Sequence, residues 1–481
     1  MPGDTIEGGG VARPSPATVA AACPLGTERL AAWVAGLRWV DLPPAVRDAA
    51  PYFLLDYLGN AIGGSRAESS AAMGRFLRGL GLAGAATAIA SELRLPPQYA
   101  ALWNGQAAHC LESDDTHQAS SSHPGASVWS AALAAGELTT ASRERVFTAA
   151  VAGYEVVGRL GAALGPAQHY ARGFHPTGTC GALGCAAVAA NLLGLDGAAT
   201  ANAFGIALSQ GAGSMEFLSG GAWTKRFHPG WAAHSGLLAA LLAREGFTGP
   251  RAAIEGKDGF LRSYSDAPRA ELVLHALGSD FQILRTSIKA HACCRYKQAP
   301  IDGLLALVRQ HRLAPSDVAR ITIGVLGAGF GIIAEPRAQK LAPQSVVDAQ
   351  FSMPYGAAVA LLHGRASIRE YAPEVLGDPA VRHEMEKVVC VRDAALDARF
   401  PRQWPAWTEV ETSDGRRLRA AIDYPKGDPE NPLSDDELAA KFEELCGTTL
   451  DGARRRAVIA AVRDPDATRP IADLTRLLGR G

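Results

Sequence analysis

The stretch that decides the fold lies in the first half of the chain, at residues 172–193, and reads RGFHPTGTCGALGCAAVAANLL. A glycine-containing break ends at His175-Pro176, and an apolar, alanine-rich segment follows it. Proline restricts the residue before it to extended backbone and suits the first turn of a helix. The stretch therefore predicts a buried helix over residues 182–193, with His175 at its entrance.

Two further His-Pro pairs, His123-Pro124 and His228-Pro229, lie in similar polar breaks. We expect each histidine at a helix entrance, where unpaired N–H groups attract anions. Lys225 and acidic residues at positions 112–115 lie close to these breaks in sequence. Together they predict a pocket for a carboxylate-bearing substrate with proton-transfer groups beside it, and hence an enzyme.

Segments with apolar residues at helical spacing surround this stretch on both sides. They cover residues 30–37, 44–62, 126–141, 145–164, 198–208 and 232–245. Their many alanines and glycines permit close approach of neighbouring helices. The N-terminal half is therefore expected to form a helical bundle.

After about residue 287 the pattern changes to short β-branched runs interleaved with helices. Predicted strands cover residues 318–325 and 388–392, and predicted helices cover residues 301–311 and 355–363. Residues 408–412 and 416–422, joined by an Asp-Gly turn, predict a β-hairpin. These features predict a mixed α/β region.

A capping-box pattern, Ser434 followed by Glu437, starts a further helical segment near the C-terminus. The predicted fold class is mainly α with an α/β part. We expect a disordered tail at residues 1–22, a helical domain at 23–283, an α/β lid domain at 284–432 and a helical return to the first domain at 433–481.

Composition excludes several functions. With 47 basic and 48 acidic side chains among 481 residues, the net charge of −1 gives no footprint for nucleic acid or a membrane surface. The most apolar stretch, residues 146–165, contains Glu155 and Arg159, so no membrane span is expected. Residues 1–22 lack the pattern of a secretory signal, and eight scattered cysteines fit a reducing compartment. We expect a soluble, cytoplasmic protein.

Four longer motifs carry a resemblance to a known family. They are DYLGNAIGG from Asp56, NGQAAHCLESDDTH from Asn104, RGFHPTGT from Arg172 and AQFSMPY from Ala349. In order and spacing they resemble the MmgE/PrpD family over about residues 25–470. The resemblance implies a helical domain, a smaller α/β lid, a homodimer and an active site between the domains that uses no cofactor.

The family resemblance also implies a type of chemistry. Its members make or break a C–H bond next to a carboxylate of a small polycarboxylic acid. Loss of water, loss of carbon dioxide or return of the proton to the other face follows. We therefore expect a lyase of the dehydratase or decarboxylase type, with a small polycarboxylate as substrate. An epimerase or racemase of an imino- or amino-dicarboxylate and a non-catalytic carboxylate-binding protein on the same fold are the alternatives.

Three residues are candidates for catalysis. His175 and Lys225 resemble the family's active-site histidine and lysine. His123 resembles the His-Pro histidine of the family's acidic loop, which corresponds to residues 112–123 here. An imidazole with a pKa of about 6.5 suits proton transfer near neutrality. An ammonium group in a partly dry cleft can neutralise a carboxylate or donate a proton. The competing interpretations are a structural hydrogen-bonding histidine and a solvated surface lysine.

Five residues are candidates for substrate binding: Glu112, Thr116, Thr177, Arg295 and Tyr355. Thr177 lies at a helix entrance, and the planar fork of Arg295 suits a carboxylate. Glu112 and Thr116 come from the family's acidic loop, where aspartate commonly stands at the position of Glu112. Tyr355 either reaches the substrate or only packs between the domains.

Two further features affect the chemistry. Gln298 stands at about the position where members often carry a histidine, and an amide cannot carry a proton at neutral pH. Residues 112–123 hold three carboxylates and two histidines, but their spacing matches no compact ligand motif, so no metal is expected. Cys294 is expected to pack at the base of the lid rather than to act as a nucleophile.

Overall fold

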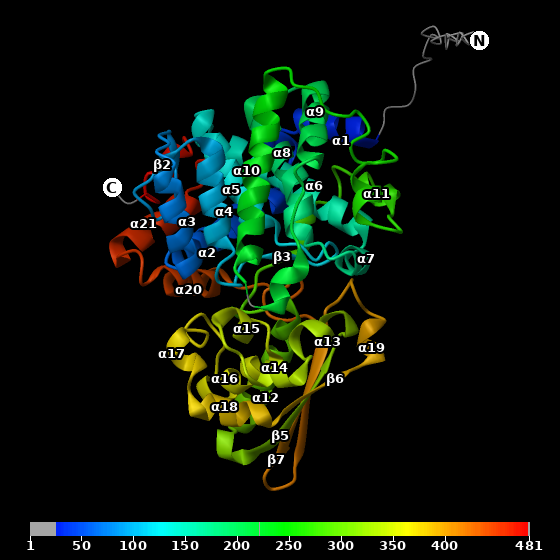
Figure 1. The fold of residues 1–481 in the computed structure, drawn as a ribbon. Helices are drawn as coiled ribbons and strands as arrows, with labels where there is room; N and C mark the ends of the chain where they lie inside the picture. Colours follow the sequence, from blue (N-terminus) through cyan, green and yellow to red (C-terminus); the bar gives the residue numbers. More distant parts are fainter. Residues whose placement is uncertain (1–25, 221, 480–481) are drawn as a thin grey trace, which may run out of the picture.

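The computed structural model describes residues 26–220 and 222–479, and the tail predicted at residues 1–22 lies outside them. Figure 1 shows a chain in two parts that meet at a waist. The larger part contains the N-terminal helices and the C-terminal return, and the smaller part contains a sheet with helices packed on it. The predicted fold class, mainly α with an α/β part, is confirmed.

The larger part is a helical bundle. Its first helices are α1 Gly26–Gly36, α2 Pro44–Gly64, α3 Glu68–Gly79, α4 Pro97–Ala108, α5 Pro124–Leu138, α6 Arg143–Leu164, α7 Pro166–Ala171, α8 Pro176–Leu193, α9 Gly197–Leu208, α10 Thr224–Arg244 and α11 Phe260–Tyr264. The returning helices are α20 Asp435–Cys446, α21 Gly452–Arg463 and α22 Ala472–Thr475. Side chains of both groups share one apolar core. The Ser434 capping box at the start of α20 is present as predicted.

Helix α8 lies at the centre of this bundle and packs against α5, α6, α9 and α10. Among the described residues it is the one helix long and apolar enough to cross a membrane. However, 89% of that segment is buried inside the protein, which is typical of a core helix. The expectation that residues 146–165 form the most apolar segment was therefore wrong, because α8 carries small polar residues but no charge.

The smaller part contains strands β5 Val318–Val325, β6 Val388–Arg392, β7 Ala406–Thr412 and β8 Arg417–Ile422. Within the described chain they form one sheet in the order β6-β5-β7-β8, in which β5 and β6 are parallel and the other pairs antiparallel. Its helices are α12 Gln298–His311, α13 Gly327–Ile333, α14 Arg337–Leu341, α15 Val346–Gln350, α16 Met353–His363, α17 Pro373–Leu376, α18 Pro379–Glu386 and α19 Ala394–Asp397. The predicted strands and hairpin are confirmed.

A short two-stranded pairing fixes the acidic loop to the start of the smaller part. Strand β3, Thr116–His117, pairs antiparallel with β4, Thr286–Ser287. Residues far apart in the sequence therefore become neighbours where the two parts meet. A second such pairing, β1 Ala86–Thr87 with β2 Arg94–Leu95, lies away from this junction in the bundle.

Two of the three His-Pro predictions hold. His123 and His175 are the N-cap residues of α5 and α8, with proline in the first turn of each helix. The third prediction was wrong, because α10 begins at Thr224 and His228-Pro229 lies inside it. Proline has no N–H, but few intrahelical hydrogen bonds are lost when it lies so near the start of a helix. The helix continues because Gly230 allows backbone contact with α4, where a Cβ atom would come within 2.4 Å of the Leu102 carbonyl oxygen.

The close approach of α8 and α10 gives a test of the fold. We predict that Gly236→Val lowers stability by about 1–3 kcal/mol or more, because its Cβ would lie 2.5 Å from the Ala186 backbone nitrogen. Thermal unfolding followed by circular dichroism measures the effect. Gly36→Ala is the control, since among the described residues its Cβ meets no atom within 4 Å. Equal melting temperatures for both variants would contradict the packing.

Candidate active site

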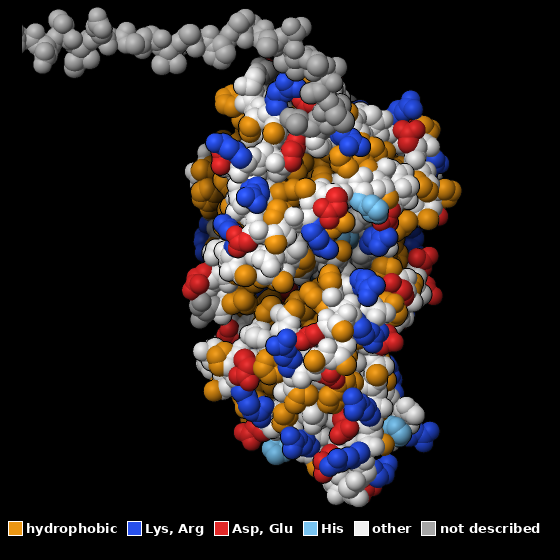
Figure 2. All heavy atoms as spheres, turned by 90° about the vertical axis from the view of Figure 1, so that its right-hand side faces the viewer, with side chains coloured by type: hydrophobic (Ala, Val, Ile, Leu, Met, Phe, Trp, Pro, Cys, Tyr) orange, Lys and Arg blue, Asp and Glu red, His pale blue; other side chains and the backbone are white. Residues whose placement is uncertain are grey.

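A small pocket lies where the two parts meet. Figure 2 shows hydrophobic side chains gathered around this waist. The free space inside is about 40 Å³, enough for about three water molecules. Its lining residues are Glu112, Thr116, Ser121, His123, Tyr170, His175, Met215, Phe217, Leu218, Lys225, Cys294, Arg295, Tyr296, Ile332, Phe351 and Trp404. The lining therefore combines charged and polar side chains with apolar and aromatic ones.

The pocket contains six of the eight residues predicted from the sequence: His123, His175, Lys225, Glu112, Thr116 and Arg295. They come from the acidic loop, from the entrances of α5 and α8, from the first turn of α10 and from the segment before α12. The N-termini of α5 and α8 both lie at this pocket, so their unpaired N–H groups add positive potential there.

The acidic loop has a strained backbone at the pocket. Glu112 has φ of 53° and Ser121 has φ of 51°, both in the left-handed region. This conformation costs about 1–2 kcal/mol for a residue with a Cβ atom. Such strain persists only where surrounding contacts impose it, and it is concentrated at functional sites. Both residues line the pocket.

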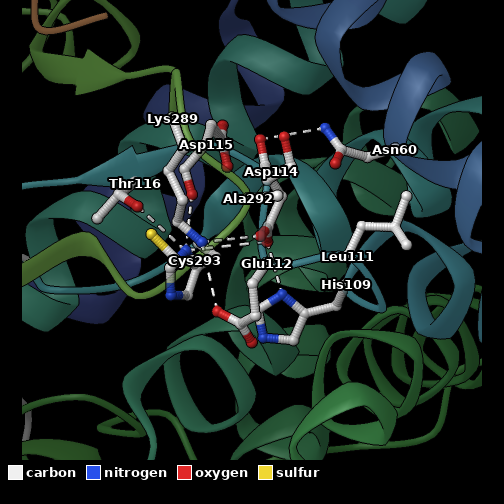
Figure 3. A network of polar contacts seen from close by, with 12 residues as sticks. Asn60, His109, Leu111, Glu112, Asp114, Asp115, Thr116, Lys289, Ala292 and Cys293 are labelled. Carbon is white, nitrogen blue, oxygen red and sulfur yellow. Dashed lines mark hydrogen bonds and ion pairs between the residues drawn. The ribbon is translucent and has the colours of Figure 1, made fainter. Parts of the chain in front are cut away.

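Lys289 provides one of the contacts that hold this loop. Figure 3 shows its side chain directed between Glu112 and Asp114. Its Nζ lies 3.1 Å from Asp114 Oδ1 and 3.5 Å from Glu112 Oε2. Burial disfavours the ammonium, but the two carboxylates outweigh this effect and raise the pKa of Lys289. Lys289 is therefore a fixed positive charge just behind the pocket wall.

Lys225 forms a buried ion pair with Glu112. Burial lowers the pKa of Lys225, although Glu112 opposes the shift. Burial alone would raise the pKa of Glu112, but Lys225 and Lys289 lower it to about 2. Glu112 therefore stays ionised, while Lys225 holds its proton less tightly than an ordinary lysine and is suited to donate it.

Three histidines converge at the same place. The ring centroids of His109 and His123 are 5.0 Å apart, those of His109 and His175 are 5.9 Å apart, and those of His123 and His175 are 6.1 Å apart. Burial, together with nearby cations, lowers the pKa of His123 and of His175 well below its usual range. Both imidazoles are therefore neutral near pH 7 and can accept a proton.

Neighbouring groups set the orientation of these rings. His109 Nδ1 lies 2.6 Å from Asp114 Oδ2, and His123 Nδ1 lies 2.7 Å from the Asp115 carbonyl oxygen. His175 Nδ1 lies 3.0 Å from Nδ1 of His228 on α10. The rings are thus held by a carboxylate, a backbone carbonyl and a fourth histidine.

Thr177 and Asp115 position other groups. Thr177 Oγ1 accepts a hydrogen bond from the His123 backbone N–H at 3.0 Å and lies 3.2 Å from His175 Nε2. It therefore links both histidines, but the described pocket lining does not include it. The carboxylate of Asp115 accepts hydrogen bonds from the Gly125 N–H and the Tyr154 hydroxyl, which anchors the loop on α5 and α6.

Arg295 and Cys294 line the pocket from the side of the smaller part. Arg295 Nη2 donates to Asp428 Oδ1 at 2.5 Å, while its Nε has no hydrogen-bond partner within the described ranges. This free donor can meet a substrate carboxylate. Burial raises the pKa of the Cys294 thiol, so the thiolate needed for nucleophilic attack is disfavoured.

Tyr355 and Gln298 lie elsewhere. Tyr355 is fully buried in the apolar core of the smaller part, where its hydroxyl donates to the Glu370 carbonyl at 2.8 Å. Gln298 is bonded to the His291 backbone through its Oε1 and Nε2, at 3.0 Å each. Neither belongs to the pocket lining within the described chain. Of the two possibilities for Tyr355, the structure favours packing, and Gln298, whose place relative to the pocket the sequence left open, lies outside it. Each stands next to a pocket motif in sequence but faces the interior of the smaller part.

Two residues at the site were missed by the sequence analysis. His109 lies in the NGQAAHCLESDDTH motif, and Lys289 lies two residues after β4. The first of these segments carries part of the family resemblance, but nothing in the local sequence showed that either side chain turns toward the acidic loop. The pairing of β3 with β4 brings Lys289 there.

The sequence models of the MmgE/PrpD N-terminal domain and of the MmgE/PrpD C-terminal domain match residues 28–273 and 291–464. The chain belongs to the MmgE/PrpD family.

Three relatives align with most of the chain. A cis-aconitate decarboxylase-like protein, oryM, from Aspergillus oryzae is 28% identical over 475 residues, which cover 94% of this chain and 97% of the relative. The cis-aconitate decarboxylase of Aspergillus terreus is 27% identical, with 94% and 95% covered. The cis-aconitate decarboxylase of Homo sapiens is 27% identical, with 94% of each chain covered.

The position of Gln298 gives a second prediction. We expect Gln298→His to lower the melting temperature and to leave the pH profile of activity unchanged. A buried imidazole cannot reproduce both backbone hydrogen bonds, which costs about 1–3 kcal/mol. Gln310→His, at an exposed position of the same helix, is the control. A shifted pH profile with unchanged stability would place residue 298 in the pocket after all.

Proposed function

We propose that this chain is a cofactor-independent lyase that decarboxylates a small unsaturated tricarboxylic acid of the cis-aconitate type. The observation that carries the proposal is the pocket between the two parts, which combines Lys225, Arg295 and neutral histidines at two helix entrances. The names of the full-length relatives support decarboxylation in particular.

The charges of the pocket suit a substrate with several carboxylates. The cations at the site are neutralised by carboxylates of the protein: Lys225 by Glu112, Lys289 by Asp114 and Arg295 by Asp428. An incoming carboxylate competes with Glu112 for Lys225 and pairs with the free Nε of Arg295. Preorganised cations of this kind stabilise negative charge that develops during reaction.

The reaction consists of one bond cleavage and one protonation. The C–C bond to a carboxylate breaks and carbon dioxide leaves. The electron pair of the broken bond stays on the allylic carbon atoms of the substrate. A proton from the enzyme then forms a new C–H bond, so a tricarboxylate trianion and one proton give a dicarboxylate dianion and carbon dioxide. We assign this proton to Lys225, since burial weakens its hold on the proton. Neutral His175 and His123 orient the substrate, and a solvent proton relayed through one of them restores the Lys225 ammonium after each turnover.

Access requires movement, since the free space of about 40 Å³ is too small for a tricarboxylic acid. A wider cavity of about 480 Å³ borders the pocket and shares Phe217, Leu218 and Phe351 with it. We propose that substrate enters past these three side chains. The apolar side chains of the lining then exclude water, which strengthens the charge interactions inside.

Product analysis in deuterated water tests the proposal. Purified protein is incubated with cis-aconitate, citrate, 2-methylcitrate and aspartate-derived acids, and products are examined by mass spectrometry with detection of carbon dioxide. Decarboxylation releases carbon dioxide and places one deuterium on carbon. Dehydration releases no carbon dioxide, and epimerisation exchanges deuterium without other loss. Binding of these acids without turnover would instead indicate a non-catalytic carboxylate-binding protein.

The catalytic residues give a third prediction. We expect His175→Ala and Lys225→Ala each to lower turnover by about a hundredfold or more, because each removes a proton-transfer group or a fixed charge. Steady-state kinetics measures this, and thermal unfolding checks the fold. Lys225→Gln is a second variant in case the unpaired Glu112 destabilises the alanine mutant. Lys257→Ala, at an exposed lysine, is the control. Near wild-type rates in both site variants would remove the assigned roles.

A further inference from the structure

We infer that His109, His123 and His175 form a binding site for a divalent transition-metal ion such as Zn²⁺, which blocks the active pocket when it binds. One ring nitrogen from each of these buried residues lies within 4.8 Å of the others. Imidazole nitrogens are preferred ligands of Zn²⁺, and three of them leave a fourth position open. The metal binding is independent of the proposed function, whereas the blocking effect rests on it.

The nitrogen of His109 that faces the cluster has no other role in the described chain. His109 is fully buried, and its Nε2 lacks a hydrogen-bond partner among the described residues. An unpaired buried polar atom is costly and calls for an explanation such as an ion. Its Nδ1 is already occupied by Asp114, so the lone pair of Nε2 is the one available for a ligand.

The surroundings resemble the outer shell of known metal sites. Metal-binding histidines usually donate their second N–H to a carboxylate or a backbone carbonyl, which fixes the tautomer. His109 has such a partner in Asp114, and His123 has one in the Asp115 carbonyl. His175 Nε2 contacts only the rotatable hydroxyl of Thr177 within the described residues, and this hydroxyl can turn away.

The geometry requires a modest contraction. At a Zn–N distance of about 2.0–2.1 Å, ligands of a tetrahedral ion lie about 3.4 Å apart, so the nitrogens must approach by up to about 1.4 Å. Side-chain rotation of His123 and His175 at the pocket surface supplies this. The charge at the site is balanced, since Lys225 and Lys289 are paired with Glu112 and Asp114. A dication therefore does not face uncompensated lysines.

Occupation of the cluster has a chemical consequence. A metal ion would take the lone pairs of His123 and His175 and fill the space needed by the substrate. The ion would act as an inhibitor, and the enzyme as proposed needs no metal for turnover. EDTA-treated protein should therefore keep its activity, and added Zn²⁺ should remove it.

The experiment uses untagged, EDTA-treated, full-length protein. Calorimetric titration with Zn²⁺ alone should show one site per chain, and Co²⁺ alone should give the visible absorption bands of a four-coordinate site. His109→Asn should weaken Zn²⁺ binding by more than about tenfold, since asparagine keeps a donor for Asp114 but loses Nε2. His383→Asn, at an exposed position of α18 in the smaller part, is the control.

The outcomes separate this inference from the proposed function. Equal Zn²⁺ affinity in wild type and His109→Asn, or no binding at micromolar concentrations, would overturn the metal site. Turnover that disappears with EDTA and returns with Zn²⁺ would overturn the inhibitory role. Metal binding can be measured even if no polycarboxylate is turned over, so failure of one proposal leaves the other testable.

Discussion

The ion pair between Lys289 and Asp114 is the interaction on which the site depends. Lys289 has no exposed surface, and Asp114 also holds the ring of His109. Removing one partner from such a buried pair costs about 3–5 kcal/mol, because the other charge remains without compensation. The pair joins the acidic loop of the helical bundle to the start of the smaller part. The pocket exists only while these two segments stay together.

The returning helix α20 supports the same junction. Lys441 Nζ donates to Asp56 Oδ1 at 2.6 Å, to the Ser113 carbonyl at 2.6 Å and to the Lys289 carbonyl at 2.8 Å. One buried ammonium therefore ties α2, the acidic loop and the segment after β4 together. This support explains how Glu112 keeps its unfavourable backbone conformation. The C-terminal residues thus contribute to the site without lining it.

Neutral imidazoles connect the proposed catalysis with the inferred metal site. In the proposed mechanism neutral histidines relay a proton to Lys225, which requires free lone pairs, and metal ions bind the same lone pairs. Desolvation keeps His123 and His175 neutral here. A pocket suited to proton transfer can therefore also bind divalent transition-metal ions such as Zn²⁺. The substrate and the metal ion would compete for it.

Local sequence determined the helices, the hairpin and the positions of His123 and His175, because proline and turn residues act within a few positions of themselves. The family resemblance also identified Lys225, Glu112 and Thr116, and side-chain chemistry identified Arg295; the structure brings all four into one pocket. Tertiary structure alone decided the rest. The direction of a side chain depends on which segments pack against it, so His109 and Lys289 turned toward the site while Tyr355 and Gln298 turned into the core of the smaller part. His228 likewise lies inside α10, because packing against α4 outweighed the local effect of its proline.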